Sequence, residues 1–410
     1  MMPGRRTYLG LVSAGLAGML AGCPGVTPDT DVTTTTTPVA EEAKLVPDAG
    51  DADDQFGWSV DLDGETALVG AWLGGGPGGE EAGSAYVFRD GTDGWRQDAR
   101  LVADEGRAGS LFGWSVALDG DTALVGARGG DYPEEGAGGA YVFQRAADGW
   151  TREAELPLEG VDPADRGVWA VALDGGTALV GMPGPNLAYV FRRRDATWVR
   201  EAVIEGVERD VWADFGWSVA LDGDTALVGA RNAPAPNGDS TGAVHVFRRR
   251  DGRGWSRRTI LRSADPDEYD EFGESVAIDG DTAVFGAPGD DEPHTNEGSA
   301  YAFSRDGGWT QRAKLLPGEE VPVGFDGGIA LSGETALIGD VYAGTGTGAV
   351  YVFQGDADGW SRRAKLVPGN AEGPWFGQSI AVSDGTALVG APYDDTSHGN
   401  RGGSAYVLDL

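Results

Sequence analysis

The chain has 410 residues, 69 of them glycine, a hydrophobic fraction of 40% and a formal net charge of −34. This acidity argues against nucleic acid or an anionic lipid surface as partner, because both need clusters of Lys and Arg. Cys23 is the only cysteine, so no disulfide can form within the chain. Lys44, Lys314 and Lys365 are the only lysines. High acidity with few lysines is typical of proteins from salt-loving organisms, and we interpret it as salt adaptation.

The first 22 residues predict an export signal. Arg5 and Arg6 precede an apolar run, residues 9–20, that is too short to span a bilayer as a helix. The arginine pair resembles a twin-arginine export signal, and Leu20-Ala21-Gly22-Cys23 resembles a lipobox, in which the cysteine carries lipid after cleavage. We therefore expect an anchor at Cys23 on the extracellular face of the cell membrane, with membrane contact only through this lipid. The alternative is an ordinary cleaved signal with an incidental cysteine.

Residues 23–42 are rich in Thr and Pro and have no hydrophobic period. A segment with so little to bury is typical of a disordered tether. The expected folded domain is therefore residues 43–410.

One pattern recurs seven times from residue 43 onward, most clearly in residues 112–127. Each copy contains four strand patterns: Ser-Val-Ala-Leu after Phe-Gly, Thr-Ala-Leu-Val-Gly after a tight Asp-Gly turn, Ala-Tyr-Val-Phe, and a last strand after Gly-Trp. Four antiparallel strands repeated radially predict an all-β fold, a seven-bladed β-propeller. The threonines that mark the copies are Thr66, Thr122, Thr177, Thr225, Thr282, Thr335 and Thr386.

The two ends of the chain predict how the ring closes. Residues 42–47 match the fourth strand pattern at 363–368, yet they precede the first copy, and the last copy stops at its third strand. We therefore expect the N-terminal strand to complete the last blade and to remove the open sheet edges. Two copies have Gly167-Val168 and Phe325-Asp326 in place of Phe-Gly, and different packing near the axis is expected there.

The recurring Phe-Gly and Gly-Ala-Pro segments resemble the FG-GAP repeat, as in Phe272-Gly273 with residues 286–288 and Phe376-Gly377 with residues 390–392. The resemblance covers residues 43–410. It is closer to a microbial variant in secreted proteins than to the N-terminal propeller of integrin α chains. It implies the propeller fold and little about function. Integrin-type copies often carry calcium loops, but the turns here are too short to supply six to eight oxygen ligands.

The strand order predicts which loops share a face. Loops before the first strand and between the second and third lie on one face and are long and varied, whereas the opposite face has short, uniform turns. Varied loops on a rigid scaffold are where recognition usually occurs. Trp72, Trp212 and Trp375 lie in or beside these loops and are the candidate ligand contacts. By contrast, we expect the tryptophans that recur in the blades to pack: Trp95, Trp150, Trp198, Trp255, Trp309 and Trp360.

Two copies carry a pattern of two aspartates and one histidine after Gly-Ala-Pro. Two carboxylates and an imidazole suit a transition metal, but the copies belong to different blades, and such aspartates also suit turns. We expect no cofactor, with Ca²⁺ or another divalent cation as the alternative. The acidic runs at 51–54 and 265–270 are likewise interpreted as solvated loops. The candidate metal ligands are Asp290, Asp291, His294, Asp394, Asp395 and His398.

The favoured function is a non-enzymatic binding or adhesion module that recognises an envelope glycan or a surface protein through the varied face. The alternatives are an enzyme that acts on extracellular polysaccharide through a carboxylate pair and a structural envelope component. No nucleophile–base pair stands out, so an enzyme is not predicted. An exposed aromatic patch on the varied face would favour binding.

Overall fold

The computed structural model describes residues 41–76, 78–103, 108–129, 138–158, 167–207, 213–250, 254–291, 298–318, 324–369 and 375–410. Arg5, Arg6 and Cys23 lie outside these residues, as does nearly all of the predicted tether. The chain divides into two compact units, 1–34 and 35–410, and the fold described here is that of the second. In its described part, no helix has the length and apolar character needed to cross a membrane.

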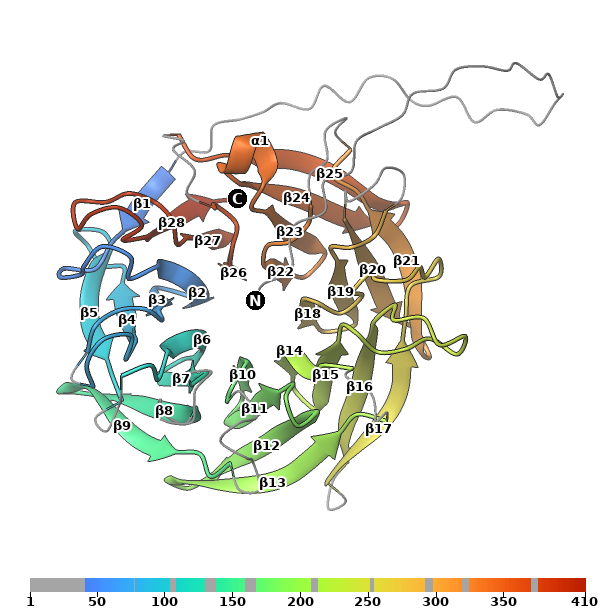
Figure 1. Cartoon of the computed structure of the whole chain (residues 1–410), viewed down its shortest axis with the longest axis horizontal. Coiled ribbons are helices and arrows are strands. Elements are labelled where there is room, and N and C mark those ends of the chain that lie inside the picture. Colours follow the sequence, from blue (N-terminus) through green and yellow to red (C-terminus); the bar gives the residue numbers. More distant parts are fainter. Residues whose placement is uncertain are drawn as a thin grey trace, which may run out of the picture. The chain divides into compact units, whose positions relative to one another are not determined.

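Seven four-stranded antiparallel sheets form a ring of blades around a central axis (Figure 1). Within each blade the first strand lies nearest the axis and the fourth lies at the rim (Figure 1). The predicted all-β, seven-bladed propeller is therefore confirmed. Its one described helix is the four-residue α1 (Ala343–Gly346).

The strands follow the repeat in chain order. Blade one contains β2 (Phe56–Asp63), β3 (Thr66–Ala71), β4 (Ser84–Arg89) and β5 (Arg96–Leu101). Blade two contains β6 (Phe112–Asp119), β7 (Thr122–Ala127), β8 (Gly139–Ala146) and β9 (Gly149–Glu155). Blade three contains β10 (Ala170–Asp174), β11 (Thr177–Met182), β12 (Leu187–Arg194) and β13 (Thr197–Glu205). Blade four contains β14 (Phe215–Asp222), β15 (Thr225–Ala230), β16 (Ala243–Arg250) and β17 (Gly254–Leu261). Blade five contains β18 (Val276–Asp279), β19 (Thr282–Ala287), β20 (Ser299–Arg305) and β21 (Trp309–Leu315). Blade six contains β22 (Ile329–Ser332), β23 (Thr335–Asp340), β24 (Ala349–Asp356) and β25 (Gly359–Leu366). Blade seven contains β26 (Ile380–Ser383), β27 (Thr386–Ala391), β28 (Ser404–Asp409) and, as its fourth strand, β1 (Glu41–Leu45).

The hydrophobic core lies between blades. One cluster, for example, joins Leu68 and Val87 of blade one to Phe112 and Val125 of blade two. The second strand of a blade is therefore covered on both faces, and all six residues of β3 are buried. The rim strand β5 instead alternates between exposed and partly buried residues, because one of its faces meets water.

The glycine of Phe-Gly lies where two neighbouring blades come into close contact. Gly57 has a φ of +91°, and a Cβ there would lie 2.2 Å from the carbonyl oxygen of Ser404 in the neighbouring blade. Only glycine fits a positive φ at such a close approach. The serine two residues later extends the contact, since Ser59 Oγ donates to the carbonyl oxygen of Gly113 in the next blade at 2.9 Å.

The two copies without Phe-Gly pack differently near the axis, as expected. At the third blade, the Oγ of Ser115 accepts a hydrogen bond from the backbone N–H of Val171 at 3.0 Å, instead of donating to a glycine carbonyl. At the sixth blade, Phe325 still fills the aromatic core, while Gly327 approaches the backbone of Gly339 and Gly377.

The ring closes through the N-terminal strand, as predicted. β1 pairs antiparallel with β28, with Lys44 opposite Tyr406. Lys44 Nζ forms an ion pair with Asp394 at 2.6 Å, and His398 Nε2 lies 2.8 Å from the carbonyl oxygen of Pro47. β1 thus gives β28 a partner strand and completes the seventh blade.

Candidate functional site

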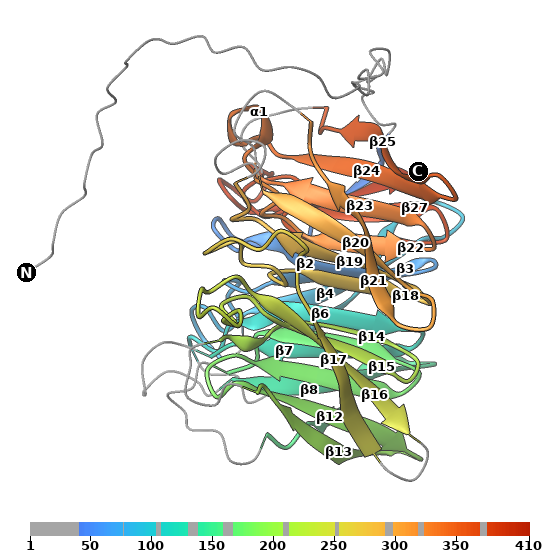
Figure 2. The same ribbon diagram turned by 90° about the vertical axis from the view of Figure 1, so that its right-hand side faces the viewer.

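The connections between second and third strands share one face with the loops that enter each blade. α1 belongs to one of these connections and lies at the left-hand edge of the ring when it is seen from the side (Figure 2). The turns between first and second strands, on the other face, have two residues each. The connections on the varied face span residues 72–83, 128–138, 183–186, 231–242, 288–298, 341–348 and 392–403.

Five tryptophans from the first four blades lie in contact on this varied face. We call them the tryptophan arc: Trp58, Trp72, Trp114, Trp169 and Trp217. Adjacent ring centroids are separated by 5.2 Å (Trp58 to Trp72), 5.0 Å (Trp58 to Trp114), 5.0 Å (Trp72 to Trp114), 5.1 Å (Trp114 to Trp169) and 4.2 Å (Trp169 to Trp217). All five side chains are partly exposed. The arc is therefore an accessible aromatic surface that crosses four blades.

The repeat explains how the arc forms. Four of its tryptophans follow Phe-Gly, or its equivalent in the third copy, at or just before the start of the first strand. The corresponding residues in blades five and seven are Glu274 and Gln378. Trp72 comes from a connection between strands, and its Nε1 donates to Gln55 Oε1 at 3.0 Å. Sequence reasoning found Trp72 but missed the other four, although tryptophan at one repeat position in four consecutive copies was a readable signal.

Two arginines pack against the rings of the arc. The Arg128 guanidinium lies 4.8 Å from the ring centroid of Trp114 and 4.9 Å from that of Trp169. Arg231 lies 3.3 Å from the ring centroid of Trp217. Both arginines occupy the position of the proline in Gly-Ala-Pro. Such cation–π contacts hold the rings in place and add hydrogen-bond donors to an otherwise aromatic surface.

A carboxyl group borders the end of the arc. Glu274 accepts a hydrogen bond from Arg231 at 3.1 Å, and Asp214 accepts another from the same guanidinium at 3.2 Å. Burial raises the pKa of Glu274 to about 7, although the charge of Arg231 acts in the opposite direction. Burial also raises the pKa of Asp326, in the next blade, to about 6. Glu274 therefore titrates near neutral pH at this end of the arc.

Trp375 belongs to a second aromatic group. Its ring centroid lies 5.7 Å from that of Tyr342 and 4.5 Å from that of Tyr393, and Arg401 lies 5.6 Å from the Tyr393 ring. Trp72 and Trp375 are thus in separate aromatic groups on blades one and six to seven. Trp212 lies outside the described residues.

A family model described as "FG-GAP repeat" matches five segments that together make up more than half of the chain: 39–88, 95–143, 198–247, 255–303 and 360–408. The chain belongs to the FG-GAP repeat family. Outside these matches lie most of the third and sixth copies, the two without Phe-Gly.

Among solved structures, the FG-GAP propeller is similar to a putative 6-phosphogluconolactonase from Bacteroides uniformis ATCC 8492, with 14% identity and a TM-score of 0.54 over 83% of this chain and 94% of the other. It is also similar to Sqt1 of Saccharomyces cerevisiae, with 12% identity and a TM-score of 0.50 over 85% of this chain and 82% of the other. At such identities the likeness shows the fold alone. A comparison with curated protein sequences gave no significant match.

The candidate metal ligands of the FG-GAP propeller have protein partners. Asp394 Oδ2 accepts hydrogen bonds from Ser404 at 2.6 Å and Tyr406 at 2.7 Å, in addition to its ion pair with Lys44. Asp395 accepts a bond from the backbone of Arg401. The described residues include no group of three or more His, Cys, Asp or Glu side chains placed to hold an ion, and His294 lies outside them. The expectation of no cofactor, with a divalent cation at these residues as the alternative, stays a prediction.

The equivalent Asp290 is also bound within its blade. It accepts hydrogen bonds from Tyr301 and from Lys314, the latter at 3.0 Å, while the neighbouring Asp291 is exposed. Each of the three lysines of the chain has its nitrogen over the ring of a tyrosine in the adjacent third strand. The nitrogen-to-centroid distances are 5.3 Å for Lys44 and Tyr406, 5.6 Å for Lys314 and Tyr301, and 5.2 Å for Lys365 and Tyr351.

The acidic runs are not simply solvated, so that expectation was wrong for two of their residues. Asp54 and Asp270 are buried, and each accepts a hydrogen bond from a backbone N–H three residues earlier, from Asp51 at 2.8 Å and from Asp267 at 2.7 Å. These carboxylates fix the loops that lead into the first strands of blades one and five.

Aspartates also surround the axis on the face with short turns, where they line a cavity of about 240 Å³. Four of them join neighbouring blades, because each accepts a hydrogen bond from a backbone N–H of the next blade. These bonds run from Gly120 to Asp63 at 2.6 Å, Gly223 to Asp174 at 2.5 Å, Gly280 to Asp222 at 2.7 Å and Gly333 to Asp279 at 2.6 Å. The ring of carboxylates thus has a structural role.

Proposed function

We propose that this FG-GAP propeller is a non-enzymatic binding module of the cell surface whose tryptophan arc recognises an envelope glycan. The observation that carries the proposal is the run of five partly exposed indoles in ring contact on the varied face. Large exposed aromatic groups are costly in water, and on a soluble scaffold they usually mark a contact surface.

The chemistry of the arc suits a sugar better than a fatty ligand. A sugar ring has an apolar C–H face, which stacks on an indole, and a rim of hydroxyl groups, which need polar partners. The site has both kinds of group, since Arg128, Arg231 and Glu274 lie among or beside the rings. The arc also crosses several blades, so an extended chain of sugar residues would contact more than one ring.

The double substitution Trp114→Ala/Trp169→Ala is expected to weaken glycan binding by at least about tenfold, because it removes the two central rings of the arc. The measurement is capture of envelope glycans from the host by immobilised protein in molar salt. Tyr269→Ala is the matched control, because Tyr269 is an exposed aromatic residue, 64% accessible, before the first strand of blade five and outside the arc. Saturable binding that both variants retain equally would contradict the proposal, and binding of a surface protein instead of a glycan would replace the ligand.

A polysaccharide-degrading enzyme is the second candidate, favoured by the carboxyl group of Glu274 with its raised pKa beside Trp217. The same preparation distinguishes the two. Release of reducing ends from a bound polysaccharide, abolished in Glu274→Gln, would establish an enzyme, whereas binding without release supports a binding module.

We further propose that Cys23 carries a lipid that holds the protein on the extracellular face of the membrane, as the lipobox resemblance suggests. Cys23→Ser is expected to release the protein into the medium, because a serine offers no sulfur for lipid attachment. Fractionation of host cells measures this, with Thr36→Ser in the predicted tether as the control. Continued membrane retention of Cys23→Ser would contradict lipidation.

A further inference from the structure

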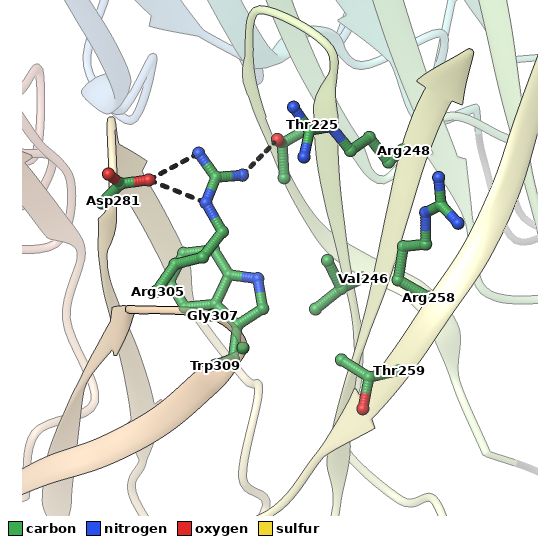
Figure 3. Close-up of a pocket in the computed structure, with 10 residues that line it drawn as sticks. Thr225, Val246, Arg248, Arg258, Thr259, Asp281, Arg305, Gly307 and Trp309 are labelled. Atoms are coloured by element: carbon green, nitrogen blue, oxygen red, sulfur yellow. Dashed lines mark hydrogen bonds and ion pairs between the residues drawn. The ribbon is translucent and has the colours of Figure 1, made fainter.

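A pocket of about 740 Å³ lies between blades four and five, next to the short turns that contain Asp281 and Gly307 (Figure 3). It is away from the tryptophan arc, which lies on the varied face. Three arginines line the pocket, although the chain as a whole has a net charge of −34. They are Arg248, Arg258 and Arg305.

At the three preceding blade junctions, an acidic residue fills the corresponding position. In each of them, the residue three places after the blade tryptophan is acidic and accepts a hydrogen bond from the indole N–H of the next blade. These bonds run from Trp150 to Asp98 at 3.2 Å, from Trp198 to Glu153 at 2.9 Å and from Trp255 to Glu201 at 3.2 Å. The repeat therefore places one carboxylate between each of these pairs of blades.

The same carboxylate also lies near an arginine of the following blade. Glu153 is 2.6 Å from Arg193, Asp98 is 3.6 Å from Arg145, and Glu201 is 3.9 Å from Arg249. Each carboxylate thus receives an indole N–H and faces a guanidinium, a combination that stabilises an anion.

Between blades four and five this carboxylate is missing, because Arg258 occupies its place in the repeat. Arg305 corresponds to Arg249 and keeps its other contacts, with Asp281 at 2.7 Å and with Thr225 Oγ1 at 3.1 Å (Figure 3). Within the described residues, neither the indole N–H of Trp309 nor the guanidinium of Arg258 has an acceptor.

Figure 3 shows what these groups surround. The guanidinium groups of Arg305 and Arg248 lie on opposite sides of Thr225, and the indole nitrogen of Trp309 faces the same space as Val246. The pocket thus combines two groups without an acceptor among the described residues, the Arg258 guanidinium and the Trp309 indole N–H, with an apolar wall. Guanidinium groups bind carboxylates with two parallel hydrogen bonds, and the volume suits one or two sugar rings.

We propose that this pocket binds a carboxylate-bearing sugar, a uronic acid residue of an acidic glycan. Its carboxylate takes the place that Asp98, Glu153 and Glu201 fill at the preceding junctions. It accepts hydrogen bonds from Arg258 and the Trp309 indole and lies near Arg305. The sugar ring lies against Val246 and the Trp309 ring, with Thr259 available to its hydroxyl groups. The site is independent of the tryptophan arc and does not require that the proposed function be correct.

Calorimetric titration of the whole protein with glucuronate and with digalacturonate tests the site. We expect saturable binding of both, no binding of glucose or of the methyl ester of glucuronate, and at least a tenfold loss of affinity in Arg258→Glu. That variant introduces the carboxylate found at the three preceding junctions, so it should fold normally and its melting temperature should not fall. Arg257→Glu is the matched control, because it makes the same change of charge at the adjacent exposed residue, which does not line the pocket.

Three results would overturn the proposal. The first is the absence of saturable uronate binding in both dilute and molar salt. The second is an equal loss of affinity in Arg258→Glu and Arg257→Glu, which would indicate a general effect of charge. The third is binding of tri-glutamate without binding of either uronate, which would assign the pocket to an acidic peptide instead of a sugar.

Discussion

Gly113→Ala is expected to lower the free energy of unfolding by roughly 3 kcal/mol or more, since a backbone clash is added to conformational strain. Gly113 has a φ of +88°, and a Cβ there would lie 2.3 Å from the carbonyl oxygen of Ser84 in the preceding blade. Neither backbone can move without opening the junction between blades one and two. Urea denaturation in molar salt measures the loss.

Gly120→Ala in the same blade is the control for this experiment. Gly120 has a φ of +56°, but no atom lies within 4 Å of the place that a Cβ would occupy, so only the conformational cost of about 1 kcal/mol is expected. Equal losses in the two variants would show that the Phe-Gly glycine is needed for its backbone angle alone and not for the contact between blades.

Deletion of residues 41–47 is expected to destabilise the entire ring. The deletion leaves β28 as an open edge and removes Leu45, which is 3% exposed, from the core between blades seven and one. It also removes Lys44, the ion-pair partner of the buried Asp394. We expect a clear fall in melting temperature and a stronger tendency to associate through the exposed edge.

Removal of seven residues from the predicted tether, 30–36, is the matched control for the deletion. It shortens the chain equally and leaves β1 in place, so the melting temperature should be unchanged. If the deletion of 41–47 also left the melting temperature unchanged, the closing strand would contribute nothing measurable to the stability of the ring.

The candidate sites could be predicted only in part. Trp72 was found because it lies in a varied loop outside the regular tryptophan positions, whereas the other four tryptophans of the arc were not singled out. Trp375 packs with Tyr342 and Tyr393, in an aromatic group separate from that of Trp72. A one-dimensional pattern shows that residues are equivalent, but it does not show whether equivalent side chains of neighbouring blades come into contact.

The sequence by itself determined the class of fold, the number of blades, their strand order and the closing strand. These features follow from local signals, the two-residue period of strands and the tight glycine turns, which recur along the chain and need no knowledge of distant contacts. The tertiary structure alone decided which side chains meet between blades. Gly57 contacts Ser404, and Arg258 takes the place of a carboxylate beside Trp309, because ring closure and blade packing bring together residues that are about 50 or more positions apart.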